Sequence, residues 1–176
     1  MAEYAFVTVW RIEAPIERVY EAIFDSLAWP SWWDAVTAAQ QRALGDAAGI
    51  GAVSRFTFRG RLPYVLRFDM RVDRVERPTV LSGVASGELE GRGLWTLKPD
   101  GQATLVRYDW QIRTTKPWMN VLAPLPFVRD VFELNHDYVM RRGLVGLRRL
   151  LGVSGQELPE DSIQPPGLAG EAGLDA

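Results

Sequence analysis

A long helical pattern near the end of the chain constrains the fold more than any other feature. It covers residues 126–151 without an internal proline, and at 1.5 Å per residue such a helix would be about 39 Å long. The side chains that share one face form a largely apolar stripe: His136, Met140, Gly143, Leu147 and Leu150-Leu151. A helix of this kind buries its stripe against another apolar surface. The preceding residues are therefore expected to supply that surface.

The preceding residues show strand patterns with short turns between them. In the clearest one, residues 64–72, large apolar side chains alternate with charged ones, as in a strand with one buried face. Because no helical pattern separates the later strands, neighbours are expected to pair in antiparallel fashion. Glycines in the later strands favour a curved sheet and leave volume beneath the helix. The other predicted strands are residues 4–12, 36–42, 53–59, 80–86, 89–98 and 103–113, and the glycines are Gly83, Gly87, Gly91 and Gly93.

The first strand leads into a short amphipathic helix and a group of tryptophans. Pro15 suits the first position of a helix, where its missing N–H has no partner to lose, and apolar residues then follow at helical spacing up to Phe24. Trp29, Trp32 and Trp33 come next and make up three of the seven tryptophans of the chain. They either form a gate at the mouth of a pocket or cap the open end of the sheet as part of the core.

These patterns predict an α+β fold with one ligand-binding domain over residues 1–152. Its core is a curved antiparallel sheet of about six to seven strands wrapped around the long C-terminal helix, with short helices after the first strand. Residues 153–176 are rich in proline, glycine and acidic side chains. This composition is typical of a flexible tail.

Composition excludes several kinds of chemistry. The chain has no cysteine and a single histidine, so disulfides, thiol nucleophiles and histidine-rich metal sites are ruled out, and no metal or cofactor is predicted. A formal net charge of -2 without a basic block gives no reason to expect a nucleic-acid partner. No apolar run approaches the ~18 residues of a membrane span, and the start lacks a signal-peptide pattern. Stable membrane insertion is therefore not expected, and a cytoplasmic location is.

The chain resembles the START-like helix-grip superfamily (SRPBCC), in its polyketide cyclase/dehydrase and lipid-transport branch. The resemblance extends over residues 6–151, and its most specific part is the start of the first helix with the tryptophan group. The residues that carry it are 12–20, Asp25, 29–33, 135–140 and 143–147. It implies the helix-grip fold and an internal cavity for a hydrophobic molecule. Because the superfamily includes lipid carriers, hormone receptors, cyclases, hydrolases and chaperone partners, it does not specify the function.

Inward-facing aromatic and apolar side chains are the candidate ligand-binding residues. They are Trp32, Trp33, Phe56, Phe58, Leu66, Phe68, Met70, Trp95, Tyr108, Trp110, Trp118, His136 and Met140. His136 and Tyr108 are also the candidate catalytic residues, because an imidazole or a phenol could move a proton or orient a ligand. The alternative for each is ordinary core packing, with His136 hydrogen-bonded to a neighbouring group. Asp69, Asp73 and Asp109 fall on the outward face beside arginines, where salt bridges explain them better than acid–base catalysis.

Three functions remain open on these grounds. The first is binding of a hydrophobic small molecule such as a lipid, isoprenoid or polyketide, for carriage or sequestration. The alternative is a polyketide-type cyclase/dehydratase that uses a cavity histidine or tyrosine for proton transfer. The third is a protein-interaction module with an exposed apolar patch around residues 118–125. That segment could also form a lid, or a surface that touches a membrane transiently while a lipid is exchanged.

Overall fold

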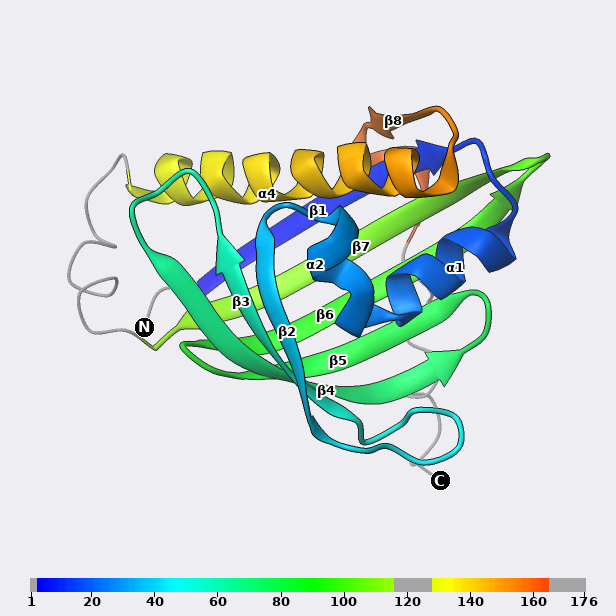
Figure 1. Cartoon of the computed structure of the whole chain (residues 1–176). Coiled ribbons are helices and arrows are strands. Elements are labelled where there is room, and N and C mark those ends of the chain that lie inside the picture. The colour runs from blue at the N-terminus through cyan, green and yellow to red at the C-terminus, as the bar shows by residue number, and fades with distance from the viewer. Residues whose placement is uncertain (1–2, 116–127, 165–176) are drawn as a thin grey trace, which may run out of the picture.

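The computed structural model describes residues 3–115 and 128–164 of the 176-residue chain. An eight-stranded sheet in the order β2-β3-β4-β5-β6-β7-β1-β8 lies beneath one long helix (Figure 1). All neighbouring strands are antiparallel. The strands are β1 (Glu3–Ile12), β2 (Val36–Ala43), β3 (Val53–Arg59), β4 (Val65–Glu76), β5 (Val80–Gly87), β6 (Leu89–Asp100), β7 (Ala103–Thr114) and β8 (Gly155–Leu158).

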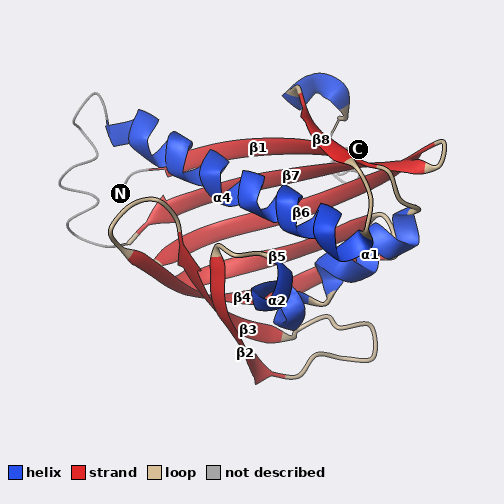
Figure 2. Ribbon diagram, turned by 45° about the horizontal axis from the view of Figure 1, so that its top comes forward, coloured by secondary structure: helices blue, strands red, loops and turns tan. Residues whose placement is uncertain are grey.

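The helices lie on one face of this sheet. The long helix α4 (Val128–Leu151) crosses the strands, and α1 (Ile16–Phe24) and α2 (Trp29–Trp32) lie near its C-terminal end (Figure 2). Two 3-10 turns, η1 (Ser26–Ala28) and η2 (Glu160–Ser162), complete the described elements. The predicted α+β helix-grip architecture is confirmed. The sheet has one strand more than the predicted range.

The additional strand comes from the segment that was predicted to be flexible. Strand β8 pairs with the edge of β1, where Leu158 lies opposite Val9. Arg107 Nη1 then donates to the backbone carbonyls of Glu160, at 2.7 Å, and Ile163, at 2.9 Å, and the Ile163 side chain is buried. Composition did not predict this because the stabilising partners are the open edge of β1 and one arginine on β7. Both are distant in the sequence.

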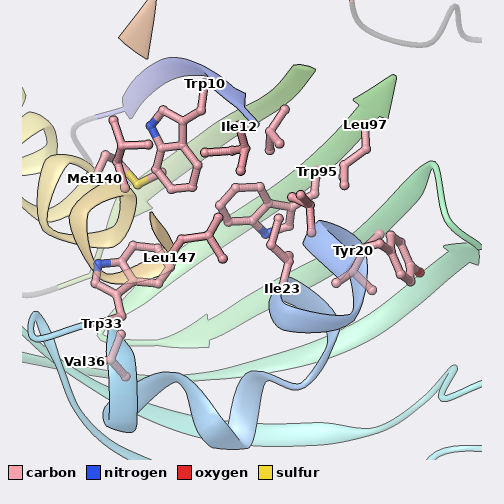
Figure 3. Close-up of a cluster of buried hydrophobic side chains, with 14 of the residues drawn as sticks. Trp10, Ile12, Tyr20, Ile23, Trp33, Val36, Trp95, Leu97, Met140 and Leu147 are labelled. Atoms are coloured by element: carbon pink, nitrogen blue, oxygen red, sulfur yellow. The ribbon is translucent and has the colours of Figure 1, made fainter. Parts of the chain in front are cut away.

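The C-terminal half of α4 packs on the core. Leu147 of α4 is fully buried against α1 and the sheet, beside Trp10 and Ile23 (Figure 3). A side-chain carbon at Gly146 would lie 1.8 Å from the backbone oxygen of Trp32, so the helix approaches α2 as closely as it does because this residue has no side chain. Leu150 is 48% exposed and does not belong to the buried stripe, contrary to the prediction. Successive residues project about 100° apart on a helix, so Leu150 points to the flank of the face on which Met140, Leu144 and Leu147 are buried.

Charged side chains of the strands lie on the face away from the helices. Arg55 pairs with Asp69 at 2.8 Å, Arg92 with Asp73 at 2.5 Å, and Arg107 with Asp109 at 2.7 Å. The predicted ion pairing of the outward aspartates is therefore confirmed. The pairs of Asp69 and Asp73 join different strands, whereas Arg107 and Asp109 belong to the same strand. No helix within the described residues is long and apolar enough to span a membrane.

Candidate functional site

A cavity of about 640 Å³ lies between the N-terminal half of α4 and the concave face of the sheet. It arises because α1, α2 and the C-terminal half of α4 fill only one end of the space under the helix. The cavity walls come mostly from alternate residues of strands β1–β7, together with the face of α4 that carries His136 and Met140. This period-two pattern is the reason that the sequence could identify wall residues.

Stacked aromatic rings form the floor of the cavity. The ring centroids of Trp95 and Tyr108 are 4.1 Å apart at an interplanar angle of 22°, and Tyr108 stacks in turn on Trp110 at 5.8 Å. Trp110 lies 5.9 Å from Phe68, which stacks on Phe58 at 5.6 Å. Trp95 comes from β6, Tyr108 and Trp110 from β7, Phe68 from β4 and Phe58 from β3. They present a continuous surface suited to contact with a flat apolar molecule.

A glycine on β6 allows the rings to lie flat. Gly93 is the cross-strand partner of Trp110. A side-chain carbon at this position would lie 2.8 Å from the Tyr108 hydroxyl oxygen and 3.1 Å from the Trp110 ring. Gly93 therefore leaves the space that the strand glycines were predicted to leave. Any larger residue at this position would displace the rings of Tyr108 and Trp110.

His136 projects from α4 and stacks on Phe6 of β1, with ring centroids 4.2 Å apart and an interplanar angle of 10°. Burial lowers the pKa of His136 to about 4, although the neighbouring Asp137 opposes this shift. The imidazole is therefore neutral at pH 7. Its Nε2 atom is buried and has no hydrogen-bond partner within residues 3–115 and 128–164. On the other side of the ring, His136 Nδ1 lies 3.7 Å from Asp137 Oδ1, so a neighbouring carboxylate does contact the imidazole. The role of His136 therefore stays a prediction.

Tyrosine hydroxyls provide the other polar groups of the walls. Burial raises the pKa of Tyr108, and it raises the pKa of Tyr64, near the opposite end of the cavity, to about 12. Both phenols therefore keep their protons at neutral pH and can donate a hydrogen bond. Together with His136 they offer a few polar points in an otherwise apolar space. This is the usual composition of a small-molecule site.

The two ends of the cavity differ in chemistry. At one end, Asn135 of α4 fastens the β3–β4 loop, because its Oδ1 accepts hydrogen bonds from the backbone N–H groups of Arg61, at 2.9 Å, and Leu62, at 3.4 Å. At the other end, the lining includes the exposed side chains of α1, η1 and the β2–β3 loop. Three of these are carboxylates and two are leucines: Glu21, Asp25, Asp46, Leu27 and Leu44.

The tryptophan group closes the end of the sheet from the core side. Trp33 Nε1 donates to the Val139 carbonyl at 2.8 Å, and Trp29 Nε1 donates to the Ile23 carbonyl at 3.1 Å. Trp29 and Trp33 each have one surface on the cavity, whereas Trp32 is buried behind them and does not line it. The group is thus a cap with two lining members. The prediction of a lining position for Trp32 is wrong because the short α2 helix turns this side chain toward the core.

A comparison with known protein families identifies the family of this chain. A family described as polyketide cyclase / dehydrase and lipid transport matches residues 5–152. The chain belongs to this family. The predicted resemblance to that branch of the START-like superfamily is confirmed. A search of curated protein sequences finds no significant match.

Solved structures share the fold of this chain. Zhui aromatase/cyclase from Streptomyces sp. R1128 superposes with a TM-score of 0.64 and 17% identity, over 86% of this chain and 93% of that one. A START superfamily protein from Mycobacterium smegmatis gives 0.66 and 13%, over 84% and 98%. The protein TTHA0849 from Thermus thermophilus gives 0.65 and 19%, over 86% and 98%. At these identities the likeness is one of fold, and it carries no residue roles.

The structure brings most of the predicted site residues of this family member to one cavity. Its lining contains Trp33, Phe56, Phe58, Leu66, Phe68, Met70, Trp95, Tyr108, Trp110, His136 and Met140. Trp118 lies outside the described residues. No group of three or more histidine, aspartate or glutamate side chains that could hold a metal ion occurs in the described part of the chain.

Other lining residues were not among the predicted binding residues. Phe6 and Tyr4 lie on the same face of β1 as Trp10, so strand alternation could have identified them. Phe132 precedes His136 by about one helical turn, and Asn135 is its direct neighbour in the sequence, so both could have been placed near it on α4. The attachment of the β3–β4 loop by Asn135 had no sequence signal, because it depends on where the loop meets the helix.

Proposed function

We propose that this chain binds an apolar, ring-containing small molecule in the cavity beneath α4. The observation that carries the proposal is the stacked floor of Trp95, Tyr108 and Trp110 in a space of about 640 Å³. Burial of ~300 Å² of ligand surface at ~25 cal/mol per Å² would contribute roughly 7 kcal/mol before the entropic costs of association. The tyrosine hydroxyls and His136 would set the ligand's orientation.

Family membership supports this function without selecting the ligand. The family description joins cyclisation and dehydration of polyketides with lipid transport. A lipid, an isoprenoid, a quinone and a polyketide all combine apolar surface with a carbonyl or hydroxyl group. Each would match the few polar points of the walls, so the type of molecule is the question for experiment.

Native mass spectrometry of the gently purified protein, combined with titration by an apolar fluorescent dye, tests the proposal. Met70→Trp would fill part of the cavity, and it should weaken dye binding at least about tenfold because the probe loses its contact area. Arg71→Trp is the matched control, since Arg71 is exposed and follows Met70 in β4 on the opposite face. A protein that takes up neither dye nor lipid, or equal binding by both variants, would contradict the proposal.

A second candidate is the cyclase/dehydratase activity. It is favoured by the buried Nε2 atom of His136, which has no hydrogen-bond partner among the described residues. A neutral imidazole can accept a proton from a C–H group next to a ligand carbonyl, and the Tyr108 phenol can donate a hydrogen bond to the oxygen on which charge develops. His136→Gln should then abolish turnover of a polyketone substrate and leave its binding largely intact. Turnover that survives this substitution would exclude the histidine as the base.

The third hypothesis, a protein-interaction module, rested on residues 118–125, and transient membrane contact rested on the same segment. These residues lie outside the described part of the chain, so both stay predictions. Gel filtration with light scattering would show whether the protein forms assemblies that require such a patch.

A further inference from the structure

The described walls of the cavity carry no cationic side chain, although the chain has 20 lysine and arginine residues. None of the described residues that line the cavity is a lysine or an arginine. Four strand arginines lie on the opposite face of the sheet and pair with carboxylates there: Arg55 with Asp69, Arg92 with Asp73, Arg107 with Asp109, and Arg113 with Glu90. Strand alternation explains this separation, because each arginine is adjacent in sequence to a residue of the inward face.

The polar groups of the interior cannot serve as a counter-ion. The imidazole of His136 is neutral at pH 7, since its pKa is lowered to about 4 by burial. Tyr108 and Tyr64 keep their protons and are neutral donors. From the lining residues that the structure describes, a ligand carboxylate would receive only hydrogen bonds from neutral groups. A buried charge without an opposite charge is strongly unfavourable, so the ligand would give up its charge or remain outside.

The carboxylates at the α1 end act in the same direction. Glu21, Asp25 and Asp46 all line the cavity there. Glu21 is paired with Arg77, which stacks over the Phe24 ring at 4.0 Å. Asp46 Oδ1 accepts hydrogen bonds from two backbone N–H groups of its own loop. Among the described residues at this end, the carboxylates outnumber the one paired arginine, so this part of the rim repels an approaching anion.

We propose that the cavity selects uncharged ligands and admits a carboxylic acid only in its protonated form. The inference rests on the proposed binding function and narrows it. Among the candidate apolar ligands it favours alcohols, ketones, quinones and neutral polyketides over free fatty acids. A hydroxyl or carbonyl group on such a molecule would meet His136 or Tyr108, and the rest would contact the aromatic floor.

A matched pair of fluorescent compounds tests this selectivity: 9-anthracenemethanol and 9-anthracenecarboxylic acid, which share one ring system. Their dissociation constants would be measured between pH 6 and 8 by quenching of tryptophan fluorescence, with calorimetry as a second method. If only the protonated acid binds, its apparent dissociation constant rises about tenfold per pH unit, because its pKa is about 4 and the protonated fraction falls by that factor. The constant of the alcohol should stay level over the same range. At pH 7.5 the alcohol should bind at least about tenfold more tightly than the acid, a difference of about 1.4 kcal/mol.

Each outcome of this experiment decides one of the two proposals. An acid that binds as tightly as the alcohol, or whose constant does not change with pH, overturns the inference and leaves the binding function standing. If neither compound binds or displaces a bound ligand, the binding function fails and the inference fails with it.

A charge placed in the cavity provides an independent test. Met70→Lys would add an ammonium group to the wall, and Met70→Gln is a neutral control of similar length. The lysine variant should bind the carboxylate at least about tenfold more tightly than the glutamine variant does at pH 7.5, while the alcohol shows no such gain. If both variants bind the carboxylate equally, charge does not limit its binding. Should the lysine variant fail to fold, the pH dependence of the unaltered protein still decides.

Discussion

The buried histidine makes the stability of the fold depend on pH in a way that one substitution can isolate. In the unfolded chain His136 has an ordinary pKa of about 6.5, and in the folded protein burial lowers its pKa to about 4. Between these values the unfolded chain binds a proton that the folded protein does not, so acid favours unfolding. The stability associated with the neutral imidazole is fully present above pH 6.5 and is lost as the pH falls toward 4.

The size of the effect follows from the two pKa values. Integration of the linkage relation between pH 7.5 and pH 5 gives a loss of about 2 kcal/mol for this single group. His136→Phe removes the titration and keeps a ring of similar shape stacked on Phe6. The wild-type protein should therefore lose about 2 kcal/mol more than the variant between these pH values. Other titrating groups contribute to both proteins and cancel in the difference.

Urea denaturation followed by circular dichroism at pH 7.5 and pH 5 provides the measurement. The slope with respect to urea should be the same for both proteins, so that a shift in midpoint reports a change in stability. If the phenylalanine variant proves unstable at both pH values, His136→Gln supplies the same comparison. An equal pH dependence for wild type and variant would refute the reasoning, because it would mean that the imidazole is solvated or paired in the folded protein.

Three further predictions concern the way in which the helix and the sheet are held together. In a thermal unfolding assay, Gly146→Ala should destabilise the protein by about 1–3 kcal/mol, because the new methyl group would overlap a backbone oxygen of α2. Val145→Ala, on the exposed face of the helix, is the control and should cost under about 1 kcal/mol. Arg107→Ala should release β8 and η2, seen as faster amide hydrogen exchange there; unchanged protection would contradict the role given to this arginine. Asn135→Ala should speed amide exchange in the β3–β4 loop and raise the dissociation rate of a bound dye, and Leu134→Ala, at an exposed position, serves as its control.

Local patterns in the chain were sufficient for the elements and for most of the wall. Strand alternation placed Phe56, Phe68 and Trp110 on one face, and the helical period placed His136 and Met140 on another. These periods are geometric properties of the backbone, so they hold whatever the partner of each element is. The family resemblance then supported the helix-grip arrangement that these patterns had already predicted.

The errors occurred where a residue's surroundings come from distant parts of the chain. Gly155–Leu158 looks like tail by composition, yet the open edge of β1 recruits it as a strand. Trp32 looks like a wall residue by its neighbours, yet the turn of α2 places it in the core. Neither the free edge nor the helix direction is encoded in the few residues around these positions.

The sequence by itself determined the α+β class, the long helix over a curved antiparallel sheet, and the apolar character of the interior. It did so because periodicity and residue size act locally along each element. Only the tertiary structure decided that the interior is partly empty, that the imidazole of His136 has an unpaired nitrogen there, and that the described walls contain no cation. These properties depend on how far α4 lies above the sheet and on which side chains meet beneath it. Both are set by the packing of all the elements together.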